Sequence, residues 1–262
     1  MPTVISHDGT TIAFDRSGDG PPVVIVGAGP TDRSAHQSLA ALLASCCTVF
    51  NYDRRGRGDS GDTAPYAVDR EYEDLAAILG EAGGSAGVYG DSGGGILGLE
   101  AVARGLPITR LAVWEPPYVI DGSRPPVPQV YREQLATLLA AGRRGDMVEL
   151  FLTQAVGMPA EVVGPMRTSP FWPSMEAVAH ALVYDAMIVG DFSLPTGRVA
   201  GVKAPTLVLD GGQTPWLSTS ARAVVDAVPN ARRHTVEGQP HNVDAVALAP
   251  ALVQFFGEGG AS

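Results

Sequence analysis

The sequence predicts an α/β fold with a mostly parallel central sheet and an inserted helical cap. Three observations lead to this fold class. Short β-branched runs alternate with helix-like runs up to residue 116, the alternation resumes after residue 200, and the stretch between them has helix-like runs but no recognisable strand. Such alternation is typical of a parallel sheet covered by helices. We therefore expect a core domain formed by residues 1–116 and 201–262, with residues 117–200 as a helical cap (lid).

The first half of the core is expected to begin with a hairpin. Strand-like runs at 3–5 and 11–15 flank a turn signal at residues 7–9, which predicts an antiparallel pair. At 23–26, four β-branched residues follow two prolines and precede a glycine-rich turn, which indicates a buried parallel strand. Further strands are expected at 48–51, 87–89 and 109–113, and helices at 34–44, 72–82 and 94–104.

The cap and the second half of the core follow from the same kind of pattern. Helical spacing in the cap is found at 128–141, 146–156 and 174–189, between joints rich in proline and glycine. The core resumes with strands expected at 206–210 and 232–236 and helices at 218–227 and 243–256. The tail, residues 257–262, is expected to be loose.

Composition excludes several classes of function. The 262 residues carry a formal net charge of −10, so nucleic acid and anionic membranes are unfavourable partners. No apolar run approaches the roughly 20 residues that span a bilayer, and the N-terminus shows no secretion signal. The two cysteines, Cys46 and Cys47, are adjacent, which is unsuited to an ordinary disulfide or a zinc site. We expect a cytoplasmic protein that acts on a small-molecule substrate without metal or cofactor; a homodimer remains open.

A candidate nucleophile lies at a predicted strand-to-helix junction. Gly90, Ser92 and Gly94 form a Gly-x-Ser-x-Gly pattern there, and small residues on either side of a serine permit a sharp backbone turn. The serine would project at the N-terminus of the helix, where the amide of Gly93 faces a developing oxyanion. The alternative is a glycine-rich turn with a solvated serine. A phosphate-binding loop is less favoured, because the P-loop lysine is missing.

Over nearly its full length the chain resembles the α/β-hydrolases. The resemblance is carried by the Gly-x-Ser-x-Gly turn at Ser92 (the elbow), the helical insertion after the sixth strand and a late histidine. A serine needs a base to remove its proton, and histidine titrates in the right range. The sequence offers five histidines: His7, His36, His180, His234 and His241. In the α/β-hydrolases the base occupies the loop after the last strand, and only His241 matches that place. The alternative is a capping or solvated loop histidine.

The third member of the expected triad departs from the family pattern. Thr214 stands where the family usually has an aspartate, and Asp210 comes four residues earlier. The other location known in this fold is the end of the preceding strand, where Glu115 follows an apolar run. This order of serine, glutamate and histidine resembles the zearalenone hydrolases (lactonases) and related bacterial hydrolases. We predict Glu115 as the acid, with Asp210, or a structural role for Glu115, as alternatives.

The resemblance also suggests an oxyanion hole and a pocket. The amides of Gly29 and Gly93 are the expected oxyanion donors, and a slip of one residue would replace Gly29 by Ala28. Loop 53–60 contains three arginines, which we expect to be solvated around a scaffold formed by Asp53 and Gly56. The aromatic candidates for substrate contact are Trp172, Tyr184 and Trp216; packing within the cap is their alternative role.

The sequence thus predicts a serine hydrolase that cleaves an ester or lactone of a small to medium apolar molecule through an acyl-enzyme on Ser92. A cofactor-free acyltransferase or perhydrolase on the same triad is one alternative, because another nucleophile can replace water. A non-catalytic protein that binds ligands in a hydrolase-like pocket is the other, since Thr214 replaces the usual aspartate.

Overall fold

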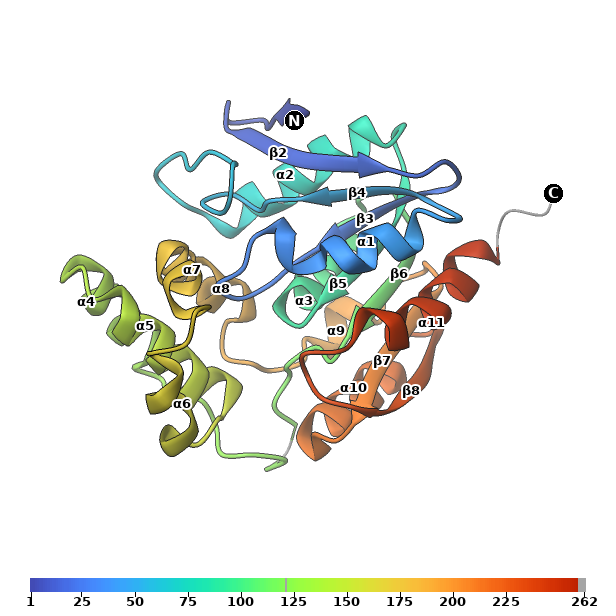
Figure 1. Cartoon of the computed structure of the whole chain (residues 1–262). Coiled ribbons are helices and arrows are strands. Elements are labelled where there is room, and N and C mark those ends of the chain that lie inside the picture. The colour runs from blue at the N-terminus through green and yellow to red at the C-terminus, as the bar shows by residue number, and fades with distance from the viewer. Residues whose placement is uncertain (121, 259–262) are drawn as a thin grey trace.

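The computed structural model describes residues 1–120 and 122–258 and confirms the predicted α/β fold with a mostly parallel sheet. Within the described residues the central sheet has eight strands in the order β1-β2-β4-β3-β5-β6-β7-β8 (Figure 1). The strands are β1 (Thr3–Ile5), β2 (Thr11–Ser17), β3 (Pro22–Val26), β4 (Thr48–Tyr52), β5 (Ala86–Asp91), β6 (Ile108–Trp114), β7 (Thr206–Gly212) and β8 (Ala231–Gln239). β1 and β2 form the predicted hairpin, and β2 pairs antiparallel with β4.

The remaining strands are parallel, and this brings the candidate site together. β3 pairs with β4 on one side and β5 on the other, and β5, β6, β7 and β8 follow as successive parallel neighbours, with register shifts in the β5–β6 and β7–β8 pairs. Parallel strands end at the same edge of a sheet, so the segments that follow β3, β5, β6 and β8 meet there. Ser92, Glu115 and His241 all lie in these segments.

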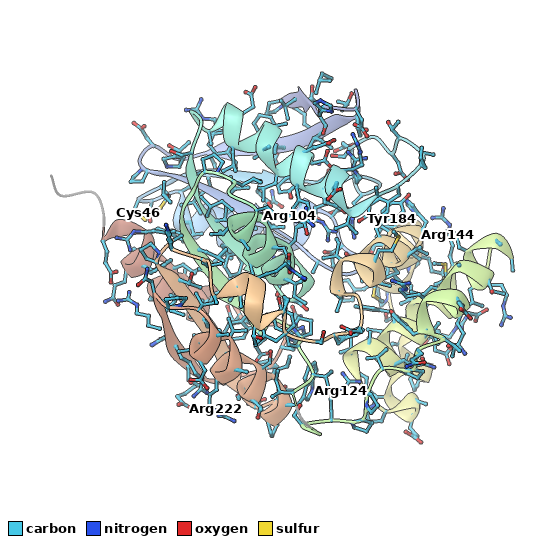
Figure 2. The ribbon with its side chains drawn as sticks, turned by 180° about the vertical axis from the view of Figure 1, so that it is seen from behind. Cys46, Arg104, Arg124, Arg144, Tyr184 and Arg222 are labelled. Atoms are coloured by element: carbon cyan, nitrogen blue, oxygen red, sulfur yellow. The ribbon has the colours of Figure 1, made fainter. Side chains whose placement is uncertain are left out.

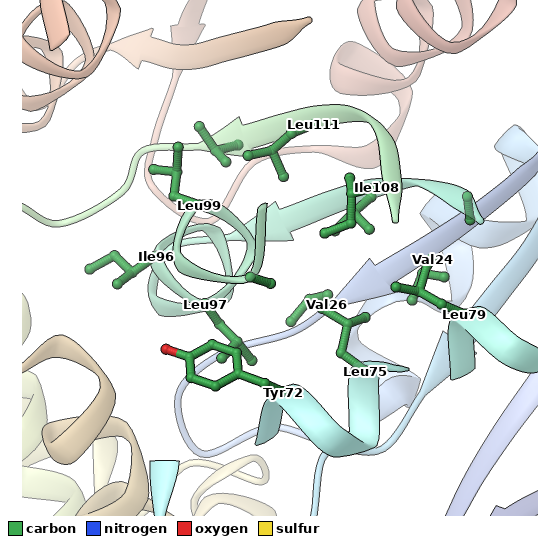
Figure 3. Packing of buried hydrophobic residues seen from close by; sticks show 14 of the residues in the cluster. Val24, Val26, Tyr72, Leu75, Leu79, Ile96, Leu97, Leu99, Ile108 and Leu111 are labelled. Atoms are coloured by element: carbon green, nitrogen blue, oxygen red, sulfur yellow. The ribbon is translucent and has the colours of Figure 1, made fainter. Parts of the chain in front are cut away.

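Helices cover both faces of the sheet. α1 (Gln37–Leu43) and α11 (Ala245–Gly257) lie on one face, while α2 (Val68–Glu81), α3 (Gly93–Ala103) and α10 (Pro215–Ala227) cover the other (Figure 1). Each face buries its own apolar cluster. Figure 3 shows the cluster beneath α2 and α3, in which Leu75 and Leu97 pack toward Val26 of the central strand. Burial of apolar area on both faces is the main stabilising contribution to this core.

A group of helices lies between β6 and β7, in the region where the sequence predicts the cap. They are α4 (Tyr131–Ala140), α5 (Arg144–Leu150), the π-helix η2 (Phe151–Val156), α6 (Ala160–Met166), α7 (Trp172–Ala177), η3 (Ala179–Ala181), α8 (Leu182–Val189) and α9 (Thr196–Val199). The buried side chains of α4 to α8 form a third apolar cluster that includes Leu135, Met147 and Trp172, whereas Val199 of α9 belongs to the cluster beneath α2 and α3. The cap helices therefore have a core of their own beside the sheet (Figure 1).

The structure divides three predicted helices and adds two that were not predicted. The run at 34–44 is a 3-10 turn, η1 (Arg33–His36), followed by α1, and the run at 146–156 is α5 followed by η2. The run at 174–189 is split between α7, η3 and α8, whereas α6 and α9 were missed. Of the tail predicted to be loose, residues 259–262 lie outside the described part. Across the described residues, no helix combines the length and apolarity that crossing a bilayer requires.

Candidate active site

Ser92 lies on a sharp turn between β5 and α3. Its backbone angles are φ 50° and ψ −117°, a strained conformation for a residue with a Cβ. The turn is held by the Ser92 amide, which donates to the carbonyl of Trp114 at 2.8 Å. A Cβ on Gly90 would come within 2.5 Å of the Gly94 carbonyl oxygen, and one on Gly94 would collide with the Val26 carbonyl. Glycine at both positions is therefore a packing requirement of the elbow.

His241 lies in the loop after β8 with its imidazole directed at the serine. Its Nε2 is 3.2 Å from Ser92 Oγ, which is within hydrogen-bond distance. The indole Nε1 of Trp114 donates to the backbone carbonyl of His241 at 2.8 Å, so a buried side chain of β6 holds the loop. His234, by contrast, lies within β8 itself, where it pairs with Leu209.

Glu115 completes a chain of three polar groups. Its Oε2 lies 2.7 Å from Nδ1 of His241, and its Oε1 accepts a hydrogen bond of 2.9 Å from the amide of Gly211. The side chain is fully buried, and the backbone has φ 40°, so β6 ends in a tight bend that aims the carboxylate at β7 and His241. The two oxygens thus have different partners, one imidazole and one peptide amide.

Asp210, the alternative acid, is engaged elsewhere. Arg233 donates to its two oxygens at 2.6 and 2.9 Å, and the hydroxyl of Ser218 donates at 2.8 Å. Burial alone would raise the pKa of Asp210, but these hydrogen bonds and the arginine charge outweigh it and lower the pKa. Thr214, which stands at the family's usual aspartate position, is the N-cap residue of α10.

The environment of His241 favours its protonated form. Burial lowers the pKa of this imidazole, but the hydrogen bond to Glu115 and the negative charges of Asp91 and Glu115 outweigh burial, and the net direction is upward from the usual value. A carboxylate on Nδ1 also fixes the tautomer in which Nε2 is free to accept a proton. The arrangement is suited to taking the proton of Ser92.

The two predicted oxyanion donors lie on opposite sides of this serine in sequence. Gly93 is the first residue of α3, at the positive end of the helix. The turn formed by Gly27, Ala28 and Gly29 follows β3. A Cβ on Gly93 would contact the side chain of Ala28 at 3.6 Å, so this turn packs beside the elbow.

Two apolar side chains of the cap face the same region. A Cβ on Gly29 would lie 3.5 Å from the ring of Phe151 in η2, and one on Gly93 would lie 3.8 Å from Val189 at the end of α8. Both side chains are half-buried. Neither was singled out from the sequence, because the contact depends on how the cap folds back over the elbow.

The three predicted aromatic contacts have different environments. Trp172 is buried in the cap core, and its indole donates to Glu176 at 2.8 Å. Tyr184 stacks on Tyr66 and bonds the carboxylate of Asp62, at the junction between α8 and the loop after β4 (Figure 2). Trp216 carries the guanidinium of Arg124 over its ring at 4.7 Å. The recorded contacts of these three side chains are with other residues of the chain, and substrate contact by them stays a prediction.

The expectation that the arginines of loop 53–60 are solvated is wrong. Arg54, Arg55 and Arg57 are 1%, 0% and 3% exposed, respectively. Each is paired with carboxylates, of which only Asp8 is half-buried and the others are buried: Arg54 with Glu71 and Asp185, Arg55 with Asp74 and Asp8, and Arg57 with Asp185. A buried guanidinium is tolerated only when such partners replace its water. The signal in the sequence was the acidic pattern at Glu71 and Asp74, spaced to put both carboxylates on one face of α2.

Another of the five histidines, His36, lies close to the elbow. His36 is buried, and its Nε2 lies 3.4 Å from a carboxylate oxygen of Asp91, the residue before the nucleophile. A Cβ on Gly27 would come within 3.2 Å of this imidazole, so glycine makes room for it. Across the described part of the chain, no group of three or more histidine, cysteine or acidic side chains is arranged to hold a metal ion.

Fold and elbow geometry together define a hydrolase of the α/β class. The chain belongs to the alpha/beta hydrolase family, whose model matches residues 23–253. An alpha/beta hydrolase from Sphaerobacter thermophilus is 57% identical, with a TM-score of 0.94 over 97% of this chain and all of that one. These findings confirm the family predicted from the sequence.

Two further relatives are more distant. The structure of an enol-lactonase from Burkholderia xenovorans superposes with a TM-score of 0.70 over 97% of each chain at 22% identity, which shows a shared fold. An uncharacterized hydrolase, YraK, of Bacillus subtilis is 31% identical over 100 residues, which is 37% of either chain. The aligned part of this chain thus spans little more than a third of that curated relative.

Proposed function

We propose that this protein is a serine hydrolase that cleaves an ester or lactone through an acyl-enzyme on Ser92. The observation that carries the proposal is the continuous chain of hydrogen-bond distances from Ser92 Oγ through His241 to the buried Glu115. A nucleophile, a base and a group that orients the base are the three parts that acyl transfer to serine requires. Membership of the alpha/beta hydrolase family supports the same reaction class.

The reaction follows from the positions of these groups. Ser92 Oγ attacks the substrate carbonyl while its proton passes to Nε2 of His241, and Glu115 stabilises the resulting imidazolium. The amides of Gly93 and Gly29 stabilise the tetrahedral oxyanion. The oxyanion collapses as His241 gives its proton to the departing alcohol oxygen. Water then attacks the acyl-enzyme with His241 as base, which releases the acid and restores Ser92.

The proposed substrate is a small to medium apolar ester or lactone. Phe151 and Val189 present apolar surface from the cap next to Gly29 and Gly93, which favours an apolar acyl or ring group over a charged one. The position of the acid after β6 carries the resemblance to the zearalenone hydrolases, and the fold shared with an enol-lactonase is compatible with a cyclic ester.

The test is a burst assay with p-nitrophenyl acetate and p-nitrophenyl butyrate, followed by a panel of lactones. The wild type is expected to release one equivalent of nitrophenol quickly and then turn over steadily, and Ser92→Ala to lose both phases. Ser45→Ala is the matched control and is expected to behave as wild type, because it removes the hydroxyl of an exposed serine in the segment between α1 and β4. Full turnover by Ser92→Ala would contradict the proposal, and so would a wild type inert toward every ester and lactone tested.

A further inference from the structure

The turn after β3 has three consecutive backbone carbonyls that are each held by a side chain. Arg54 Nη1 donates to the Gly27 carbonyl at 3.2 Å, and Arg57 Nε donates to the Gly29 carbonyl at 3.4 Å. Between them, the hydroxyl of Thr31 donates to the Ala28 carbonyl at 2.8 Å. This turn is the one to which the proposed function assigns the second oxyanion donor.

Holding the carbonyls fixes the direction of the amides. In a trans peptide the C=O and the N–H of the next residue point to opposite sides of one plane. The plane that carries the Ala28 amide is therefore set by the grip on the Gly27 carbonyl, and the plane that carries the Gly29 amide by the grip on the Ala28 carbonyl. The hydrogen bond from Arg57 to the Gly29 carbonyl fixes the plane that follows, so both peptide planes that meet at the Gly29 Cα are held.

The two arginines share one carboxylate of the cap. Arg54 Nη1 and Arg57 Nη2 each lie 2.8 Å from the same oxygen, Oδ1 of Asp185 in α8. Arg57 also reaches the carbonyl of Ala181 at 3.4 Å, and Arg54 is anchored to the core by two bonds to Glu71. Asp185 is itself buried. The position of α8 is thus linked through two charge-assisted hydrogen bonds to the turn after β3.

We infer that Arg57 and Asp185 are positioning residues for the oxyanion hole. Thr31 holds the peptide plane that carries the Gly29 amide, and Arg57, seated on Asp185 of the cap, holds the next plane through the Gly29 carbonyl, so that Gly29 is restrained on both sides. The inference rests on the proposed function, since it assigns these residues to the stabilisation of an acyl-transfer transition state. It extends that function, because it makes the cap a part of the catalytic geometry as well as a wall of the pocket. Stabilisation by preorganised donors depends on their alignment before the reaction begins.

Arg57→Lys is the decisive variant, and Arg55→Lys is its matched control. Lysine keeps the positive charge beside Asp185, but a single ammonium cannot reproduce the fork that reaches Asp185 and the Gly29 carbonyl together. Arg55 belongs to the same loop and is equally buried, but its guanidinium is bound to Asp74 and Asp8, away from the turn. Both variants disturb a buried ion pair, and only one disturbs the turn.

Three quantities separate positioning from a purely structural role: kcat, KM, and the inhibition constant of an alkyl trifluoromethyl ketone, whose adduct with Ser92 places an oxyanion in the hole. Loss of a whole oxyanion donor costs about 10²–10³ in kcat, so misalignment in Arg57→Lys is expected to cost about tenfold or more. The inhibition constant should rise by a similar factor, with KM within about twofold. Arg55→Lys should keep the wild-type kcat and inhibition constant when both are measured below its unfolding temperature, even if that temperature is lowered.

Asp185→Asn is the second variant, used if Arg57→Lys does not fold. It keeps an oxygen for the arginines but removes the shared charge. Like Arg57→Lys, it should lower kcat and leave KM unchanged. Equal losses in the Arg55 and Arg57 variants, or unchanged kcat in both the Arg57 and Asp185 variants, would overturn the inference. A wild type that neither hydrolyses p-nitrophenyl butyrate nor binds the ketone would instead overturn the proposed function, and this inference with it.

Discussion

Replacing Glu115 with glutamine tests the candidate triad at its most buried member. The Gly211 amide donates to Glu115 Oε1, so the carbonyl oxygen of the new side chain must take that place. Its NH2 group then lies where Oε2 now contacts Nδ1 of His241 at 2.7 Å. The opposite orientation would bury two donors facing each other, at a cost of about 1–3 kcal/mol for an unsatisfied group. The Gly211 amide therefore selects the orientation that puts a donor against the imidazole.

This orientation forces the wrong tautomer on the base. Nδ1 must accept a hydrogen bond from the amide, so the proton resides on Nε2, which then cannot take the proton of Ser92. Loss of the correct tautomer in a serine–histidine–acid triad lowers kcat by about 10⁴. We expect a fall of about 10³–10⁴ for Glu115→Gln, equivalent to about 4–5.5 kcal/mol in the barrier.

The assay is steady-state hydrolysis of p-nitrophenyl butyrate, with circular dichroism to show that the variant is folded. Asp210→Asn is the control, because Asp210 is the alternative acid and its carboxylate is bound to Arg233 and Ser218. That variant should lose stability and keep kcat within a few fold. A loss below tenfold in Glu115→Gln, or a larger loss in Asp210→Asn, would refute this reasoning.

Three further predictions concern the surroundings of the site. The charge of Asp91 helps to raise the pKa of His241. Asp91→Asn should therefore lower that pKa and move the acid limb of the kcat/KM profile to lower pH. A shift to higher pH would contradict the assignment. Gly94→Ala should destabilise the fold by about 1–3 kcal/mol in urea unfolding, because the new methyl collides with the carbonyl that ends β3, and an unchanged midpoint would contradict the packing. Glu71→Gln should cost about 3–5 kcal/mol, because it removes a charge from the buried pair with Arg54; a loss below 1 kcal/mol would mean that the remaining partner suffices.

The fold could be predicted in detail because its signals are local. The β-branched run at 23–26 and the glycines around Ser92 reflect requirements of the strand and the turn themselves, and the structure has β3 and the elbow at those places. The cap was harder to divide correctly. The π-helix η2 ends at Val156 and is capped by Gly157, which has φ 85°, but periodicity alone does not show where an α-helix changes to a π-helix.

The part of the site that could be predicted consists of the residues that follow strands. Ser92, Glu115 and His241 each follow a strand of a parallel sheet, so their convergence at one edge follows from topology. Arg57 could not be placed this way, because its partner Asp185 is 128 residues away in the cap. Without that carboxylate, water would be the expected environment of an arginine in a loop, and the prediction of solvated side chains follows that default.

Reaction with a fluorophosphonate, followed by peptide mapping, tests the central claim most directly. The reagent modifies a serine hydroxyl only when a base activates it, and it does not depend on the shape of the natural substrate. We expect one adduct on wild-type protein, on Ser92, and labelling slower by at least about 10³-fold in His241→Ala. An adduct on another serine, or equal labelling of the wild type and His241→Ala, would contradict the account of Ser92 as a nucleophile activated by His241.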